Sequence, residues 1–191
     1  CPPRNLANGH LVSQRPFPNN PQKSHVYHSN SPQLNQAGAR LHMGQFLMTI
    51  SAVAGSDLSD NQHRCGFFGT PSEDYAEVFG VVERAVQAAL AAAKPGVQAS
   101  AVDKAARDVI AASGYGDKFL HRTGHGLGID IHEPPYIAAN SDVVLAEGNV
   151  FSIEPGIYLS GAFGVRLEEI VVLRADGAEI FSEMPRDMVI R

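Results

Sequence analysis

The chain has 191 residues, 44% of them hydrophobic, and a formal net charge of −5. This length supplies one sizeable core and too little material for two ordinary domains, so we expect one folded domain. No apolar run approaches the roughly 20 residues of a membrane span, and the N-terminus lacks the basic-then-apolar pattern of a signal peptide. The composition therefore predicts a cytoplasmic protein with no membrane partner.

Cysteine content and charge exclude two further classes of protein. Cys1 and Cys65 cannot form a disulfide framework and lack the paired spacing of a thiolate metal site, so any metal must be held by His and carboxylate groups. Residues 1–66 carry five Lys or Arg against two Asp, a balance of +3, which leaves −8 for the rest of the chain. Because this mild balance includes no basic cluster, we expect no nucleic-acid partner.

The first third of the chain differs in texture from the rest. Residues 1–66 contain 6 Pro, 7 Asn, 6 Gln, 7 Ser and no Glu, and they show no sustained helical or alternating period before about Gly44. Such composition is typical of loop or disorder. We expect residues 1–40 to be irregular or poorly ordered and residues 41–191 to form the folded domain, with the change of texture near residue 66.

Two helices are predicted after this change. The first begins at Pro71 and Ser72, because Ser is a favoured helix cap, and it ends at the Lys-Pro-Gly of residues 94–96. In the second, Ser100 and Asp103 resemble a capping box, and the Ser-Gly of residues 113–114 should end the helix. Apolar residues recur at helical spacing in both helices: Tyr75, Val78, Phe79, Val82, Ala85 and Ala89 in the first, and Val102, Ala105, Ala106, Val109 and Ile110 in the second.

Strands are predicted in the last quarter of the chain. Residues 150–153 and 157–159 have strand composition, and residues 170–173 and 178–181 flank an Asp176-Gly177 turn as a hairpin. Helices followed by antiparallel strands indicate the α+β class.

Histidine and glutamate gather in the same half of the chain. Three His lie within twelve residues, one Glu follows a predicted strand, and two consecutive Glu lie on another: His121, His125, His132, Glu154, Glu168 and Glu169. Strand alternation sends Arg166 and Glu168 to one face and Glu169 to the other, so only one of the two Glu should enter a shared site. Glycines at positions 124, 126 and 128 would leave space where a metal and a substrate approach the backbone.

Ordinary structural roles remain open for the same residues. A single His in a Gly-rich loop is more often structural or solvated than catalytic. Glu168 could form a surface ion pair with Arg166, and Glu154 could cap a turn before Pro155.

Three segments carry a resemblance to a known family. HRTGHGLGIDIHEPP at 121–135, FSIEPG at 151–156 and GVRLEE at 164–169 resemble, in order and spacing, the C-terminal half of the Xaa-Pro dipeptidase and aminopeptidase family of prolidases and methionine aminopeptidases. The resemblance implies the pita-bread fold, with residues 41–191 as the peptidase-like catalytic domain. His121, four residues before His125, is more similar to prolidases than to methionine aminopeptidases.

The resemblance also implies roles for individual residues. His125 and Glu154 would bind one metal, and Glu168 would bridge two. His121 and His132 would contact substrate and assist proton transfer, with His132 at the oxyanion. Arg166 would contact the substrate or support the metal ligands.

The implied activity is hydrolysis of the Xaa-Pro bond in dipeptides or short peptides. Mn²⁺ is the expected metal, with Co²⁺, Fe²⁺ or Zn²⁺ as alternatives, since all accept His and carboxylate ligands. Such cations lower the pKa of a shared water and generate hydroxide near neutral pH. Family members often dimerise, so a homodimer is expected by analogy.

The upstream half of the family pattern is incomplete in this chain. The family has two metal-binding Asp eleven residues apart; Asp60 fits the second, whereas the first falls on Thr49. His28 is a weak match to an upstream substrate-contacting His. We therefore interpret the chain as a divergent or N-terminally truncated member with one or two ions. The alternative is a non-catalytic homologue that binds peptide or protein with one metal or none.

Overall fold

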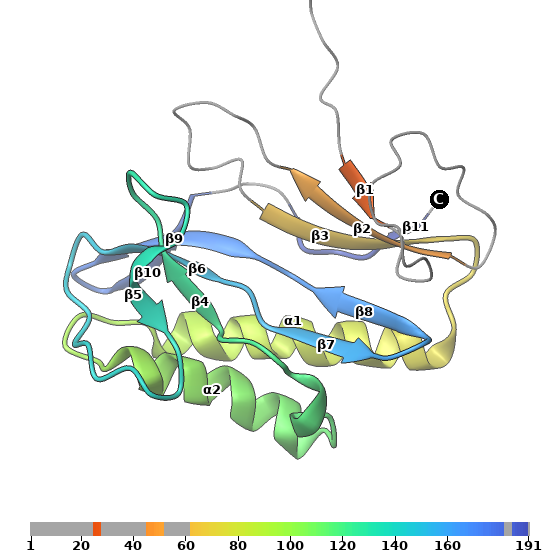
Figure 1. Cartoon of the computed structure of the whole chain (residues 1–191), viewed down its shortest axis with the longest axis horizontal. Coiled ribbons are helices and arrows are strands. Elements are labelled where there is room, and N and C mark those ends of the chain that lie inside the picture. Colours follow the sequence, from red (N-terminus) through yellow and green to blue (C-terminus); the bar gives the residue numbers. More distant parts are fainter. Residues whose placement is uncertain (1–24, 28–44, 52–61, 182–184, 191) are drawn as a thin grey trace, which may run out of the picture.

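The computed structural model describes residues 25–27, 45–51, 62–181 and 185–190 (Figure 1). Asp60 and His28 lie outside these ranges, so their predicted roles stay predictions. Among the described residues, no helix is long and apolar enough to cross a membrane.

Helix α1, Glu73–Ala92, follows the sequence prediction closely. Ser72 is its N-cap, and the Ser72 hydroxyl accepts a hydrogen bond of 3.2 Å from the Tyr75 backbone N–H. This satisfies one of the four N–H groups that a helix start leaves without a partner. All six apolar residues that define its predicted stripe are buried. The predicted first helix is confirmed.

Helix α2, Ala99–Ala112, is confirmed as a helix, but the predicted capping box is wrong. Gln98 is the N-cap, without a side-chain hydrogen bond, so Ser100 lies inside the helix. Asp103 is fully buried and accepts a hydrogen bond of 2.9 Å from the Thr123 backbone N–H. Arg107 also pairs with this carboxylate. Asp103 therefore anchors the segment that leads into the histidine region, instead of capping its own helix.

The strands form three sheets. A five-stranded sheet has the order β10-β9-β6-β4-β5, a hairpin pairs β7 with β8, and a four-stranded sheet has the order β1-β2-β3-β11. A short 3-10 helix, η2 (Gly116–Lys118), precedes β4. The strand bounds are β1 His25–Tyr27, β2 Gln45–Ser51, β3 Gln62–Phe68, β4 Gly124–Gly126, β5 Glu133–Ile137, β6 Val150–Ile153, β7 Gly156–Leu159, β8 Phe163–Arg166, β9 Glu169–Arg174, β10 Gly177–Ile180 and β11 Val189–Ile190.

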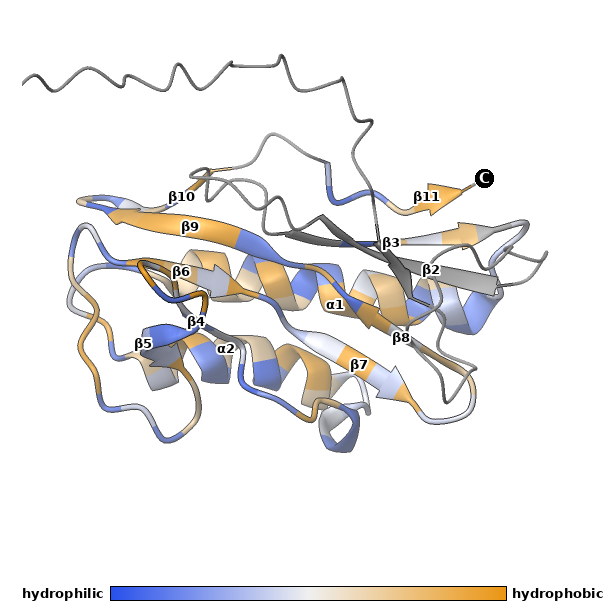
Figure 2. Ribbon diagram, turned by 45° about the horizontal axis from the view of Figure 1, so that its top comes forward, coloured by the Kyte–Doolittle hydropathy of each residue, from blue (hydrophilic) through white to orange (hydrophobic). Residues whose placement is uncertain are grey.

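Both helices lie on one side of the strands (Figures 1 and 2). Helix α1 contacts β6, β7, β8 and β10, and α2 packs on α1 and β5. The core between these layers is apolar and includes Tyr75, Val82, Ile110, Phe151, Ile153, Leu167 and Leu173. Among the strands that the structure describes, every pair is antiparallel except β3 with β11. The α+β class is confirmed.

Part of the region expected to be irregular is paired in a sheet. Residues 25–27 form β1 inside the 1–40 segment, and β3 spans the expected change of texture at residue 66. Strand β3 pairs in parallel with β11, where Val189 lies opposite Gly66. Local periodicity cannot reveal the pairing of β3 with β11, because the two strands lie more than a hundred residues apart in the chain.

Candidate metal centre

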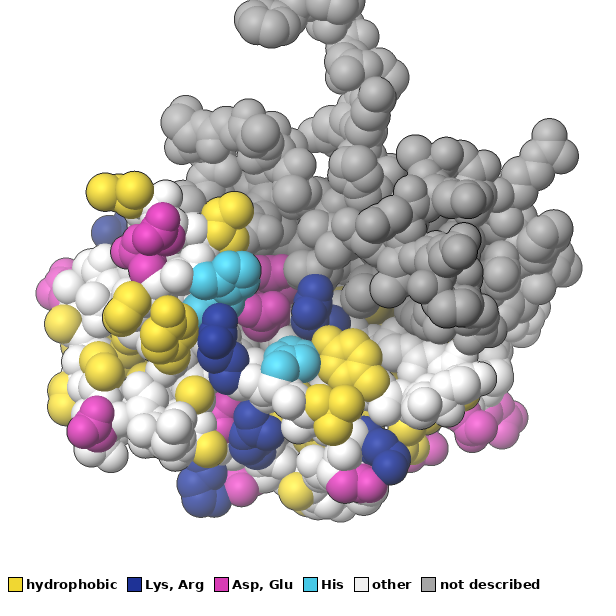
Figure 3. All heavy atoms as spheres, viewed as in Figure 1, with side chains coloured by type: hydrophobic (Ala, Val, Ile, Leu, Met, Phe, Trp, Pro, Cys, Tyr) yellow, Lys and Arg dark blue, Asp and Glu magenta, His cyan; other side chains and the backbone are white. Residues whose placement is uncertain are grey.

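His125, Glu154 and Glu168 converge. Each offers one ligand atom, and these three atoms lie within 4.8 Å of one another. His125 is 4% exposed, Glu168 1%, and the Glu154 side chain 12%. Glu168 is buried, so a contact between it and Arg166 would not be a surface ion pair. Histidine and acidic side chains lie beside basic ones on one face of the molecule (Figure 3).

Three neighbouring strands place these side chains. Strand β6 lies between β4 and β9 in the five-stranded sheet. His125 is on β4, Glu154 directly follows β6, and Glu168 directly precedes β9. The sheet therefore brings together residues that are up to 43 positions apart in the chain.

The glycines around His125 are explained by the neighbouring backbone, which corrects the sequence interpretation. A Cβ at Gly124 would lie 1.8 Å from the Ser152 carbonyl oxygen, and one at Gly126 would lie 2.3 Å from the Pro134 carbonyl oxygen. Glycine is required here because adjacent backbone approaches closely. The space is filled by β5 and β6, not reserved for a metal or a substrate.

The His125 ring is oriented through both nitrogens. Nδ1 lies 3.1 Å from the Gly126 carbonyl oxygen, and Nε2 lies 3.1 Å from Oε1 of Glu154. When Nδ1–H donates to Gly126, Nε2 is left as the ligand nitrogen. Burial lowers the pKa of His125, but the hydrogen bonds to Glu154 and to the Gly126 carbonyl outweigh it, and the pKa is raised.

The electrostatics of the cluster fit a divalent cation. Burial would raise the pKa of Glu154, but the His125 hydrogen bond and the Arg166 charge outweigh it, so the pKa is lowered and the carboxylate stays ionised. Two buried carboxylates at one site repel each other unless a cation lies between them. One imidazole and two carboxylates are suitable ligands for Mn²⁺, Co²⁺, Fe²⁺ or Zn²⁺.

Ser152 supports this cluster and was missed by sequence reasoning. Its fully buried hydroxyl donates to Oε1 of Glu154 at 3.0 Å and accepts from the His125 backbone N–H at 3.0 Å. One hydroxyl thus fixes two ligand residues. The only sequence signal was the position of Ser152 in β6, two residues before Glu154.

Replacing Ser152 by Ala should weaken metal binding by about tenfold, because groups that orient metal ligands typically contribute about 10–100-fold to affinity. The measurement is a Mn²⁺ titration of the folded variant. Thr at this position keeps the hydroxyl and is the matched control. Equal affinity in the Ala variant and the wild type would show that Ser152 does not orient the ligands.

His121 lies in a second polar group beside the cluster. Its Nε2 is 2.8 Å from the Tyr158 hydroxyl, and its Nδ1 is 2.7 Å from the Arg122 carbonyl oxygen. Burial lowers the pKa of His121. Burial also raises the pKa of Tyr158, although the Arg166 charge opposes that shift. Tyr158 was missed because nothing in its local sequence indicates a histidine partner.

His132 and Arg166 border the cluster from two directions. The His132 ring is exposed, and its centroid lies 4.2 Å from that of His125. Arg166 Nε lies 3.9 Å from Oε2 of Glu154, and its side chain is 22% exposed. The structure brings every described candidate of the site to one region, while the individual roles stay predictions.

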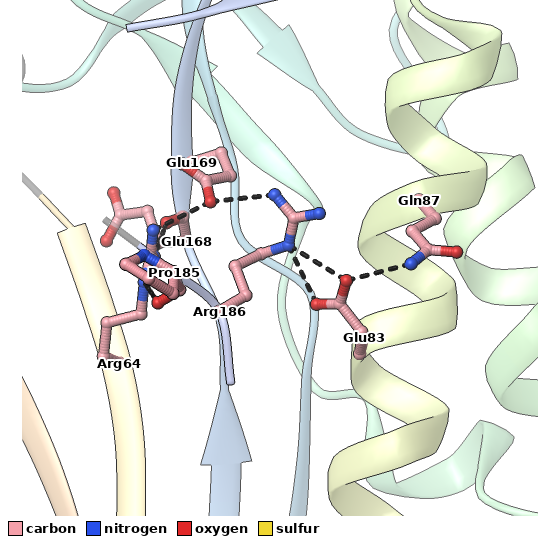
Figure 4. Close-up of polar contacts among 7 residues, drawn as sticks. All are labelled: Arg64, Glu83, Gln87, Glu168, Glu169, Pro185 and Arg186. Carbon is pink, nitrogen blue, oxygen red and sulfur yellow. Dashed lines mark hydrogen bonds and ion pairs between the residues drawn. The ribbon is translucent and has the colours of Figure 1, made fainter. Parts of the chain in front are cut away.

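The two consecutive glutamates separate, as strand alternation predicts. Glu168 joins the cluster, whereas Glu169 is buried between Arg64 and Arg186 (Figure 4). The backbone of Thr49 lies opposite Arg64 in the β2–β3 pair. This places the position that lacks the first Asp one strand from Arg64.

The α+β fold, with a His and two Glu gathered beside its five-stranded sheet, matches the pita-bread class of metallopeptidases. The solved structures similar to it include a prolidase and Xaa-Pro peptidases. The family model for metallopeptidase family M24 matches residues 20–175, and the chain belongs to this family. The match begins within residues 1–40, upstream of the predicted start of the domain.

Individual relatives agree with the family match. The chain is 40% identical over 164 residues to the probable dipeptidase PepE of Mycobacterium bovis, covering 85% of this chain and 44% of the relative. It is 39% identical to the Xaa-Pro dipeptidase of Lactobacillus helveticus, in a match that covers 86% of this chain and 48% of the relative. The crystal structure of dipeptidase PepE from Mycobacterium ulcerans superposes with a TM-score of 0.79 at 37% identity. The superposition covers 87% of this chain and 46% of the PepE chain. The chain thus spans about half the length of these relatives.

Proposed function

We propose that this chain carries the metal site of a peptidase that hydrolyses the Xaa-Pro bond of dipeptides or short peptides. The observation that carries the proposal is the buried His125, Glu154 and Glu168 cluster in a member of family M24. Relatives named Xaa-Pro dipeptidase support proline as the second substrate residue.

The three clustered residues would hold the metal, with Mn²⁺ as the proposed ion and Asp60 as a further ligand. When bound, a divalent cation supplies Lewis acidity and an activated water near neutral pH. Ser152 and the Gly126 carbonyl oxygen orient the ligands before any ion binds. Such preorganisation reduces the cost of assembling the site.

Side chains beside the cluster would handle the substrate. His132 is exposed next to His125, so it can contact a substrate carbonyl oxygen and stabilise developing negative charge there. Burial lowers the pKa of His121, which favours the neutral imidazole, so His121 can accept a proton while Tyr158 holds its ring. The His125 hydrogen bond and then the Arg166 charge lower the pKa of Glu154, and Arg166 can also pair with a substrate carboxylate.

The test is hydrolysis of an Xaa-Pro dipeptide by the Mn²⁺-reconstituted protein, followed by release of free proline. We expect turnover with Xaa-Pro and much slower turnover with the matching Xaa-Ala dipeptide. Exposed Glu179, replaced by Gln, is the control and should retain full activity. Metal binding without turnover on either dipeptide would contradict the proposal.

A second candidate function is peptide or protein binding without catalysis. Thr49 supports it, because a neutral residue replaces a family metal ligand. Peptide binding without hydrolysis, with one ion or none, would favour this candidate. In both cases a peptide is the proposed ligand, and the cytoplasmic location and the homodimer stay predictions.

A further inference from the structure

A chain of charged side chains runs from Arg64, which contacts the Glu168 backbone, to helix α1 (Figure 4). Arg64 of β3 lies 2.8 Å from Oε1 of Glu169, and Arg186 lies 3.0 Å from the same oxygen. Arg186 also lies 2.9 Å from Oε2 of Glu83 on α1, and Gln87 donates to Glu83 at 3.0 Å. The chain joins four segments of the fold through Glu169, the neighbour of Glu168.

Arg64 is the member that reaches the metal-site strand most directly. Its guanidinium donates to the backbone carbonyl of Glu168, to the carboxylate of Glu169 and to the backbone carbonyl of Pro185. Only 6% of Arg64 is exposed. The planar guanidinium has five N–H donors in a fixed, forked geometry and can bind three oxygens at once. A lysine ammonium, whose donors all lie on one nitrogen, cannot reproduce this geometry.

These contacts hold the carbonyl of the peptide bond between Glu168 and Glu169 and the side chain that follows it. The Glu168 carbonyl is held by Arg64, and the next side chain is held by Arg64 and Arg186 together. Because Glu168 directly precedes β9, holding its carbonyl and the Glu169 side chain restricts the direction in which the Glu168 side chain leaves the backbone. The direction of the Glu168 carboxylate therefore depends on this charge chain through the backbone that Arg64 contacts.

The C-terminal segment completes this arrangement. Pro185 supplies an acceptor for Arg64, Arg186 supplies the second cation for Glu169, and β11 pairs with β3 beside them. A segment more than a hundred residues from β3 in sequence thus covers the buried pair. Buried ion pairs are weak evidence for stability, since well-packed apolar side chains often serve equally well.

We propose that Arg64 and Glu169 are positioning residues for the metal ligand Glu168, with Arg186 of the C-terminal segment holding Glu169 in place. This inference rests on the proposed metal site. In this proposal the charge chain sets the geometry of the metal site, and it acts through the backbone of residues 168–169. A merely structural charge chain would affect folding and leave the metal affinity of the folded protein unchanged.

The experiment compares the full chain with its Arg64→Lys variant in titrations with Co²⁺, followed by visible absorption. The variant keeps the positive charge beside Glu169 but loses the planar, forked guanidinium group. We expect Co²⁺ affinity to fall by about 10–100-fold and the absorption bands to change, because orientation of a ligand tunes the metal. Arg174→Lys is the matched control: Arg174 forms an exposed pair with Glu179 across β9 and β10, and its replacement should leave affinity and spectrum unchanged.

A double variant, Arg64→Met with Glu169→Met, removes both charges, so no single partner of this pair is left alone. Its folding in the absence of metal is followed by thermal melting. Weak Co²⁺ binding by folded double and Lys variants supports the proposal. Wild-type affinity and spectrum in either folded variant would overturn it, while failure of the wild type to bind Co²⁺ would overturn the proposed metal site and this inference with it.

Discussion

Replacing Glu168 by Gln should weaken metal binding by more than about 100-fold, because even groups that only support metal ligands contribute about 10–100-fold. Glu168 is 1% exposed and supplies one of the three ligand atoms within 4.8 Å. The amide has the same shape but no charge, so it removes the negative ligand without opening a cavity. Mn²⁺ affinity, measured by calorimetric titration, is the direct readout, and dipeptide hydrolysis should fall with it.

Thermal melting separates lost metal binding from misfolding in this variant. Gln removes one of two neighbouring buried carboxylates, so the metal-free variant should melt no lower than the metal-free wild type. Saturating Mn²⁺ should raise the wild-type melting temperature and leave that of the variant unchanged; an ion at 100 times its Kd stabilises by about 2.7 kcal/mol. Exposed Glu179→Gln is the control. Equal Mn²⁺ stabilisation of the Glu168 variant would exclude Glu168 as a ligand.

Replacing Thr49 by Asp should raise the metal content from about one ion per chain towards two and increase kcat/KM at least about tenfold, equivalent to about 1.4 kcal/mol. The physical reason is the restored carboxylate, which would help to hold a second cation. The backbone of Thr49 lies opposite Arg64, which contacts the Glu168 carbonyl. Elemental analysis and dipeptide kinetics on the same sample provide the measurement.

Thr49→Asn is the matched control for this change, since it adds a side chain of similar size without charge. It should leave metal content and turnover at the wild-type level. An Asp variant that behaves like the Asn variant would show that position 49 is not equivalent to the first Asp of the family.

Local patterns predicted the helices because local contacts determine them. Ser72 caps α1 as expected, and the apolar spacing of α1 matches its buried stripe. Asp103 was misassigned because its partner, the Thr123 backbone N–H, lies twenty residues away. A capping motif and a tertiary anchor look alike in sequence, and only the fold distinguishes them.

The residues of the candidate site could be predicted from the sequence, but the residues that orient them could not. Alternation separated Glu168 from Glu169 but did not choose the inward one; the resemblance made that choice. Ser152 and Arg64 escaped notice because each contacts the backbone of a residue far away in the chain, Ser152 that of His125 on β4 and Arg64 that of Glu168. Such partners are defined by sheet order, which local sequence does not encode.

The central claim is that His125, Glu154 and Glu168 form a metal site, and metal content per chain after reconstitution with Mn²⁺ tests it most directly. The wild type and a His125→Ala variant would be dialysed together and analysed for manganese. We predict about one bound ion per wild-type chain and none in the variant, because the imidazole supplies the ligand that orients the site. Wild-type protein without manganese, or equal manganese in both proteins, would contradict the claim.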